Sequence, residues 1–190
     1  MSRPYDMTGR AQAAERTRDR ILTATEDLLA TRPIDEVTLP AIAADAGVSV
    51  QTVLRHTGSR DGCFRLVAQR VQQRVGAQRE ASAPGDVRGA LEGLMEHYEA
   101  EGRLVRNLLA QEPRDGFAAE AAATGRAYHR AWVQRCFGPR MRSSETTEVD
   151  ALVAATDLSV WTLLREDLGR TPTETAMVMT RLVDALLEDS

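Results

Sequence analysis

The sequence contains no lysine, and all 24 of its basic residues are arginine. Every contact of this chain with a phosphate group must therefore come from arginine, hydroxyl, amide or backbone groups. Aromatic residues make up only 4% of the chain. No apolar run approaches the length of a membrane span, and the polar start lacks the apolar core of a signal peptide. These absences predict a cytoplasmic protein with no membrane partner.

Catalytic and metal-binding patterns are missing as well. The two cysteines, Cys63 and Cys136, lie far apart and show no metal-ligand spacing, so we expect both in the core. The three histidines, His56, His97 and His129, form no metal-type pair. The sequence has no glycine-rich phosphate loop and no nucleophile elbow. It therefore predicts a protein that is not an enzyme and that needs neither a cofactor nor a metal.

The composition favours an all-α fold, because alanine is abundant and runs of β-branched residues are short. Apolar residues recur at the three- and four-residue spacing of helices along the chain. The pattern predicts about nine helices, arranged as a three-helix N-terminal helix-turn-helix domain and a C-terminal helical bundle. The expected helices cover residues 12–30, 39–45, 50–56, 59–82, 86–100, 103–111, 117–137 and 145–168, with a last helix from residue 172.

Residues 38–56 carry the most specific pattern, which is that of two short helices joined by a tight turn. Gly47 lies where the chain reverses, and a positive φ costs glycine little there. Thr38 and Ser49 are placed to cap the two helices, and Pro40 falls in a first turn, where no donor is lost. This arrangement predicts a helix-turn-helix, whose second helix enters the major groove of DNA. An ordinary helical hairpin in a bundle is the alternative.

Charge is shared unevenly between the two parts of the chain. Residues 1–80 hold 12 arginines and 10 acidic residues, whereas residues 81–190 hold 12 arginines and 18 acidic residues. A mildly basic N-terminal part and an acidic C-terminal part fit a DNA-binding domain followed by a domain that does not bind DNA.

The helix-turn-helix, the bend at residues 58–61 and the helical rear half resemble the tetracycline-repressor-type (TetR) family of regulators. Motif support covers residues 17–67. The resemblance implies a homodimer that binds a palindromic operator in double-stranded DNA, in most members as a repressor, and that releases it when a small-molecule effector enters the rear domain. The implied domains are a flexible arm at 1–11, a DNA-binding domain at 12–58, a linking helix at 59–82, and an effector-binding and dimerisation domain at 83–190.

Four positions depart from the usual pattern of that family. Leu54 stands where a tyrosine typically contacts phosphate, so that hydrogen bond cannot form here. Thr57 stands where an aromatic residue usually packs. Arg60 replaces a common lysine and keeps its attraction for phosphate, and Gln51 occupies a position often held by a small residue.

Operator recognition needs phosphate contacts for position and base-edge contacts for sequence. Gln51 can donate and accept hydrogen bonds at the major-groove edge of adenine, and Arg55 can pair with guanine or reach a phosphate. Val50 and Thr52 are small enough to approach a thymine methyl group. The positions of Thr38, His56 and Arg60 resemble those that contact phosphate in the family. The expected DNA-binding residues are Thr38, Val50, Gln51, Thr52, Arg55, His56 and Arg60, each of which would otherwise be a solvated surface side chain.

The resemblance also implies dimer and effector residues. In such proteins the last two helices pair with those of a second copy, and the two apolar stripes here suit that role or packing within one chain. The expected interface residues are Val149, Leu152, Val153, Thr156, Val160, Leu163, Met179, Leu182, Val183 and Leu186. The expected effector residues are Met95, Tyr98, Arg103, Leu104, Tyr128, Trp132 and Trp161, for which a plain aromatic core is the alternative. A helical interaction protein without DNA binding, and a regulator that takes no ligand, are the competing functions.

Overall fold

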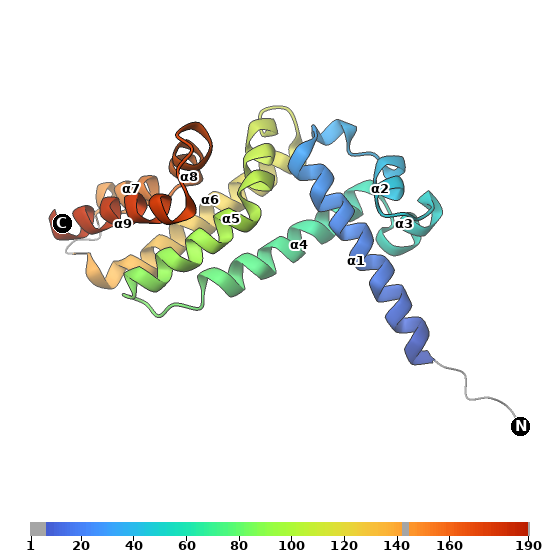
Figure 1. Cartoon of the computed structure of the whole chain (residues 1–190), viewed down its shortest axis with the longest axis horizontal. Coiled ribbons are helices and arrows are strands. Elements are labelled where there is room, and N and C mark those ends of the chain that lie inside the picture. Colours follow the sequence, from blue (N-terminus) through green and yellow to red (C-terminus); the bar gives the residue numbers. More distant parts are fainter. Residues whose placement is uncertain (1–6, 142–144, 190) are drawn as a thin grey trace, which may run out of the picture. The chain divides into compact units, whose positions relative to one another are not determined.

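The computed structural model describes residues 7–141 and 145–189 of the chain. These residues form helices and connecting turns, with no strand among them (Figure 1), which confirms the predicted all-α fold. The chain divides into two compact units, an N-terminal unit (Met1–Arg70) and a C-terminal unit (Val71–Ser190). Among the described helices, none is long and apolar enough to cross a membrane.

The N-terminal unit contains α1 (Met7–Thr31), the short 3-10 turn η1 (Ile34–Glu36), α2 (Leu39–Asp45), α3 (Val50–Thr57) and the first half of α4 (Arg60–Arg79). Its core includes Ile21, Leu29, Ile42, Val53 and Phe64, all of them buried. The first helix begins five residues earlier than predicted, because Met7, Arg10 and Ala11 are good helix formers. Residues 7–11 therefore belong to α1 and not to a flexible arm, and the rest of that expected arm lies outside the described residues.

The helix-turn-helix is built as the sequence predicts. The Thr38 hydroxyl caps α2 by accepting the Ala41 N–H at 3.3 Å, and the Ser49 hydroxyl caps α3 by accepting the Thr52 N–H at 3.2 Å. Gly47 has a φ of 63° in the turn between them. Each cap satisfies a donor that the first turn of a helix leaves free, so local hydrogen bonds fix both helix starts.

The C-terminal unit contains the rest of α4 and the helices α5 (Val87–Gln111), α6 (Gly116–Phe137), α7 (Thr146–Ala155), α8 (Leu158–Thr162) and α9 (Pro172–Asp189), with the 3-10 turn η2 (Gly138–Arg140) and the π-turn η3 (Leu163–Asp167). Helix α5 packs against α6, α8 and α9, and α7 packs against α6 and α9 (Figure 1). One apolar core joins these helices and includes Leu94, Phe137, Leu152, Met179 and Val183.

Two predicted helix boundaries in this unit are wrong. The helices expected at 86–100 and 103–111 form one continuous helix, α5, in which Gly102 gives room to the ring of Trp161. A Cβ atom at Gly102 would lie 2.8 Å from that ring, so this glycine serves close packing and does not end the helix. The helix expected at 145–168 is broken, because the Asp157 carboxylate accepts the Ser159 N–H at 2.8 Å and starts α8 anew.

Candidate functional site

The exposed face of α3 carries the side chains best placed to meet a large external partner. Gln51 and Arg55 are exposed, one helical turn apart, and have no side-chain partner among the described residues. Val50 is 36% exposed beside them, whereas Val53 on the opposite face is fully buried. The side chains predicted to contact base edges therefore share one solvent-facing surface of α3, and the buried Val53 packs the opposite face of the helix into the core.

The other predicted DNA contacts in and beside α2 and α3 already form hydrogen bonds or are partly buried within the chain. The Thr52 hydroxyl lies 2.9 Å from the Ser49 hydroxyl, and Thr52 is half-buried. Thr38 is exposed, although its hydroxyl already accepts the cap hydrogen bond of α2. His56 is half-buried on α3. Of these groups, the capping hydroxyl of Thr38 can still donate a hydrogen bond outward.

Arg60 corrects an expectation, because its guanidinium turns into the N-terminal unit. Its Nε donates to the carbonyl oxygen of Val37 at 2.7 Å, and its Nη2 donates to the carbonyl oxygen of Ile34. The guanidinium carbon also lies 4.6 Å from the centre of the Phe64 ring. Arg60 thus ties the start of α4 to the segment before α2, an internal role that the sequence pattern could not reveal.

Thr57 shows how this chain fills the position where the family usually packs an aromatic ring. Its hydroxyl donates to the Val53 carbonyl at 2.9 Å and accepts from the Cys63 thiol at 3.2 Å. Burial raises the pKa of that thiol. Cys63 and Cys136 are both buried and free, which confirms the prediction that they are core residues.

The expected effector residues lie mostly inside the core of the C-terminal unit. Their polar atoms have protein partners: the Tyr98 hydroxyl donates to the Thr156 carbonyl at 2.8 Å, and the Trp161 indole donates to Glu99 at 2.9 Å. The buried members are Met95, Tyr98, Leu104, Trp132 and Trp161, whereas Tyr128 is half-buried and Arg103 is exposed. The aromatic members of the set lie in or beside the core, whereas Arg103, the charged member, is exposed.

Sequence reasoning missed a polar network at the centre of this unit. Arg79 is only 2% exposed, and its Nη2 donates to Nδ1 of His129 at 2.6 Å. Because an arginine can only donate, Nδ1 accepts, and the neutral ring carries its proton on Nε2, which lies 3.1 Å from the Thr156 hydroxyl. His97 and Glu101 are buried nearby on α5, with Glu101 paired to Arg74 at 2.6 Å. The spacing of His97 and Glu101 from the apolar Leu94 was the signal for their burial.

The two buried histidines predict a loss of stability in mild acid. The pKa of His97 is lowered to about 3 and that of His129 to about 4, because burial disfavours a charged ring and the nearby Arg79 repels a second cation. An unfolded histidine titrates near pH 6.5. Between pH 6.5 and 4 the unfolded chain therefore binds more protons than the folded chain, and stability falls as pH falls, by up to about 1.4 kcal/mol per pH unit for each histidine.

Urea unfolding at a series of pH values checks this prediction. The double variant His97→Gln with His129→Gln should show a shallower slope than the wild type over the same range, because the two buried rings no longer contribute to it. Equal slopes would show that these histidines are charged in the folded chain.

The expected dimer residues divide into two sets. The buried set belongs to the chain's own core and is not available at the surface; it comprises Val149, Leu152, Thr156, Met179 and Val183. Val153, Val160 and Leu186 are half-buried, whereas Leu163 and Leu182 are exposed. Three further exposed apolar residues, which the sequence pattern did not single out, lie close to these two in the chain: Leu168, Met177 and Val178.

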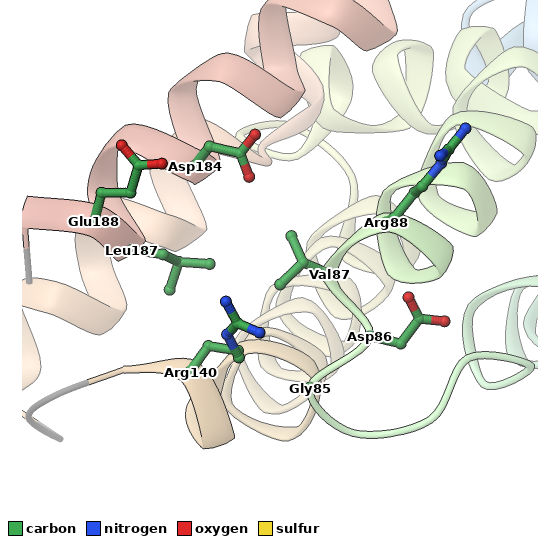
Figure 2. Close-up of a pocket in the computed structure, with 8 residues that line it drawn as sticks. All are labelled: Gly85, Asp86, Val87, Arg88, Arg140, Asp184, Leu187 and Glu188. Carbon is green, nitrogen blue, oxygen red and sulfur yellow. The ribbon is translucent and has the colours of Figure 1, made fainter.

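A shallow pocket of about 330 Å³ lies where the start of α5 meets η2 and the end of α9 (Figure 2). The side chains of Val87, Arg140 and Leu187 converge there. The lining residues are Gly85, Asp86, Val87, Arg88, Arg140, Asp184, Leu187 and Glu188, and none of the seven expected effector residues is among them. No group of side chains suited to a metal ion occurs in the described residues.

Comparison with known proteins identifies a family for part of the N-terminal unit. Residues 21–67 match the family model of bacterial regulatory proteins of the tetR family. The chain is 33% identical over 97 residues to the HTH-type transcriptional regulator AlkX of Mycobacterium tuberculosis, and the match spans 51% of this chain and less than half, 44%, of that protein.

Solved structures resemble the whole fold. A TetR-family transcriptional regulator from Streptomyces coelicolor superposes with a TM-score of 0.73 at 18% identity, covering 92% of this chain and 96% of that one. A transcriptional regulator from Rhodococcus sp. Rha1 gives a TM-score of 0.70 at 19% identity, covering 90% and 96%. The capped helix-turn-helix and the family match show that residues 21–67 form a DNA-binding domain of the tetR family of bacterial regulatory proteins, and the solved structures show the fold of the whole chain.

Proposed function

We propose that this chain is a DNA-binding transcriptional regulator that reads its operator with the exposed face of α3. The observation that carries the proposal is the pair Gln51 and Arg55, exposed without partners on a short helix whose start is capped by Ser49. A helix of this kind fits the major groove, and both side chains can pair with base edges there. The related proteins are described as transcriptional regulators, which supports the same function.

We infer that the regulator acts as a homodimer through η3 and α9. Among the described residues, five of the six large apolar side chains that remain exposed belong to this region: Leu163, Leu168, Met177, Val178 and Leu182. Val178 and Leu182 share one face of α9, four residues apart, and Met177 precedes Val178 at the edge of that face. Clustered exposed apolar side chains mark an association surface, and two-fold pairing would place two α3 helices on a palindromic site.

We further infer that the regulator represses by occupying its operator and that a small molecule in the C-terminal unit releases it. The aromatic and polar side chains buried among α4, α5 and α6 support an effector site there. Release would follow when the effector binds only the form that does not fit DNA.

Selection of bound sequences from random duplex DNA tests this function. The purified chain should enrich a palindromic site and bind it in a fluorescence-anisotropy titration, with affinity that falls steeply as salt rises. A chain that enriches no sequence and binds no duplex even at low salt would instead be a helical interaction protein.

Replacing Gln51 with alanine should change the operator that the chain prefers. A bidentate contact with adenine contributes roughly 1–3 kcal/mol of discrimination, and alanine removes it without disturbing the buried Val53. Repeating the selection with the Gln51→Ala variant checks the result, with Asp45→Ala, an exposed residue at the end of α2, as the control. If the variant returns the wild-type site, Gln51 reads no base.

A further inference from the structure

The guanidinium of Arg79 is buried without a counter-charge. It makes one hydrogen bond, to His129, and no carboxylate contacts it among the described residues. Its Nε is buried and has no hydrogen-bond partner. Buried cations are normally paired, because transfer out of water is costly for an uncompensated charge. The unpaired Nε therefore requires an explanation.

Aromatic rings support the guanidinium but cannot use its remaining donors. The guanidinium carbon lies 4.1 Å from the centre of the Trp132 ring and 5.4 Å from that of Tyr128. These faces attract a cation, yet they leave the in-plane N–H groups free. Tyr128 is the half-exposed member of the cluster, so the site comes closest to solvent at this ring.

A second orphaned nitrogen lies on the neighbouring helix. Nδ1 of His97 is buried without a partner, and the charge of Arg79 acts on this ring strongly enough to help lower its pKa. The buried carboxylate of this region, Glu101, is already paired with Arg74. Arg79 thus offers N–H donors that no carboxylate of the chain occupies, and His97 offers one more when its neutral ring carries the proton on Nδ1.

We propose that Arg79 and His97 hold the carboxylate of a small organic acid whose apolar part lies against the ring of Tyr128. This inference deepens the proposed function, because it names the chemical class of the effector. A planar guanidinium suits a carboxylate, which can accept two parallel hydrogen bonds from it. Arg103, the charged residue among the expected effector residues, is exposed and has no such setting.

A thermal-shift titration of the full chain tests the site without DNA. Benzoate and hexanoate should raise the melting temperature in proportion to the logarithm of their concentration up to about 10 mM, because they bind the folded state alone. Benzamide and hexanamide, the neutral counterparts, should have no effect. Sodium chloride and phosphate serve as inorganic controls. If they raise the melting temperature as much as the carboxylates do, the assignment of an organic acid is wrong.

Two variants locate the response. Arg79→Met keeps the length of the side chain, removes the unpaired charge and should abolish the shift, whereas Arg103→Met should keep it. If Arg79→Met does not fold, His97→Leu leaves Arg79 in place and should weaken carboxylate binding at least about fivefold. Carboxylates that do not shift the wild type, or that shift it and both site variants equally, would show that Arg79 is satisfied by internal water and the aromatic rings.

An operator-release assay separates this inference from the proposed function. With the selected operator bound, hexanoate should lower the anisotropy and hexanamide should not. Carboxylate binding without DNA binding would disprove the regulator and leave the site, whereas operator binding by a chain that ignores carboxylates would disprove the site alone.

Discussion

Replacing Met177 and Leu182 together with glutamate should convert the chain from a dimer to a monomer and lower its operator affinity by about 100-fold or more. Both side chains are exposed on α9, at 54% and 41% of their full area. An association through this face would have to bury two carboxylates from each protomer without partners, which costs several kcal/mol. Since each 1.4 kcal/mol is a factor of ten, the loss of pairing removes most of the affinity for a two-fold site.

Sedimentation velocity gives the oligomeric state, and anisotropy with the selected operator gives the affinity. A matched control adds the same two charges to exposed positions of α6, as Ala123→Glu with Ala127→Glu, and should remain dimeric and bind normally. A Met177 and Leu182 double variant that stays dimeric would place the interface on another surface.

The Arg60→Ala variant should lose about 2–4 kcal/mol of the free energy of unfolding of the N-terminal unit. Alanine removes the side-chain donor to the Val37 carbonyl, removes one donor to the Ile34 carbonyl, which also accepts the Val37 N–H at 3.1 Å, and removes the cation that lies over Phe64. Hydrogen bonds to a charged group contribute about 1.5–3 kcal/mol, and a cation–π contact adds about 0.5–1 kcal/mol. Urea unfolding followed by circular dichroism measures the loss.

Arg55→Ala is the matched control, because it removes the same side chain from an exposed position without partners. Its stability should stay within about 0.5 kcal/mol of the wild type, while its operator affinity falls. The opposite result at Arg60, with unchanged stability and a shallower salt dependence of DNA binding, would restore it as a phosphate contact.

Local chemistry explains why the helix-turn-helix could be predicted residue by residue. The caps at Thr38 and Ser49 and the left-handed turn at Gly47 depend on side chains and backbone only a few residues apart. The same holds for the start of α9, where Glu174 and Thr171 cap each other across one turn. Such features need no knowledge of distant contacts.

Predictions that depended on distant contacts were less accurate. Gly102 marks no helix end because the ring of Trp161, far along the chain, packs against it. Arg60 had the charge and position of a phosphate contact, but the carbonyl groups of Ile34 and Val37 hold its guanidinium. Similarly, the apolar pattern of the last helices could not separate the core residue Met179 from the exposed Met177 and Leu182.

The sequence by itself determined the helical fold class, the helix-turn-helix and the set of side chains on α3, because helix periodicity, capping and turn chemistry act within a few residues. Only the tertiary structure decided which arginines face solvent and which are used internally. Arg55 and Arg79 are the same amino acid, yet one stays exposed while the other is buried between aromatic rings and beside two histidines. The difference arises because burial and charge pairing are set by neighbours that are distant in sequence.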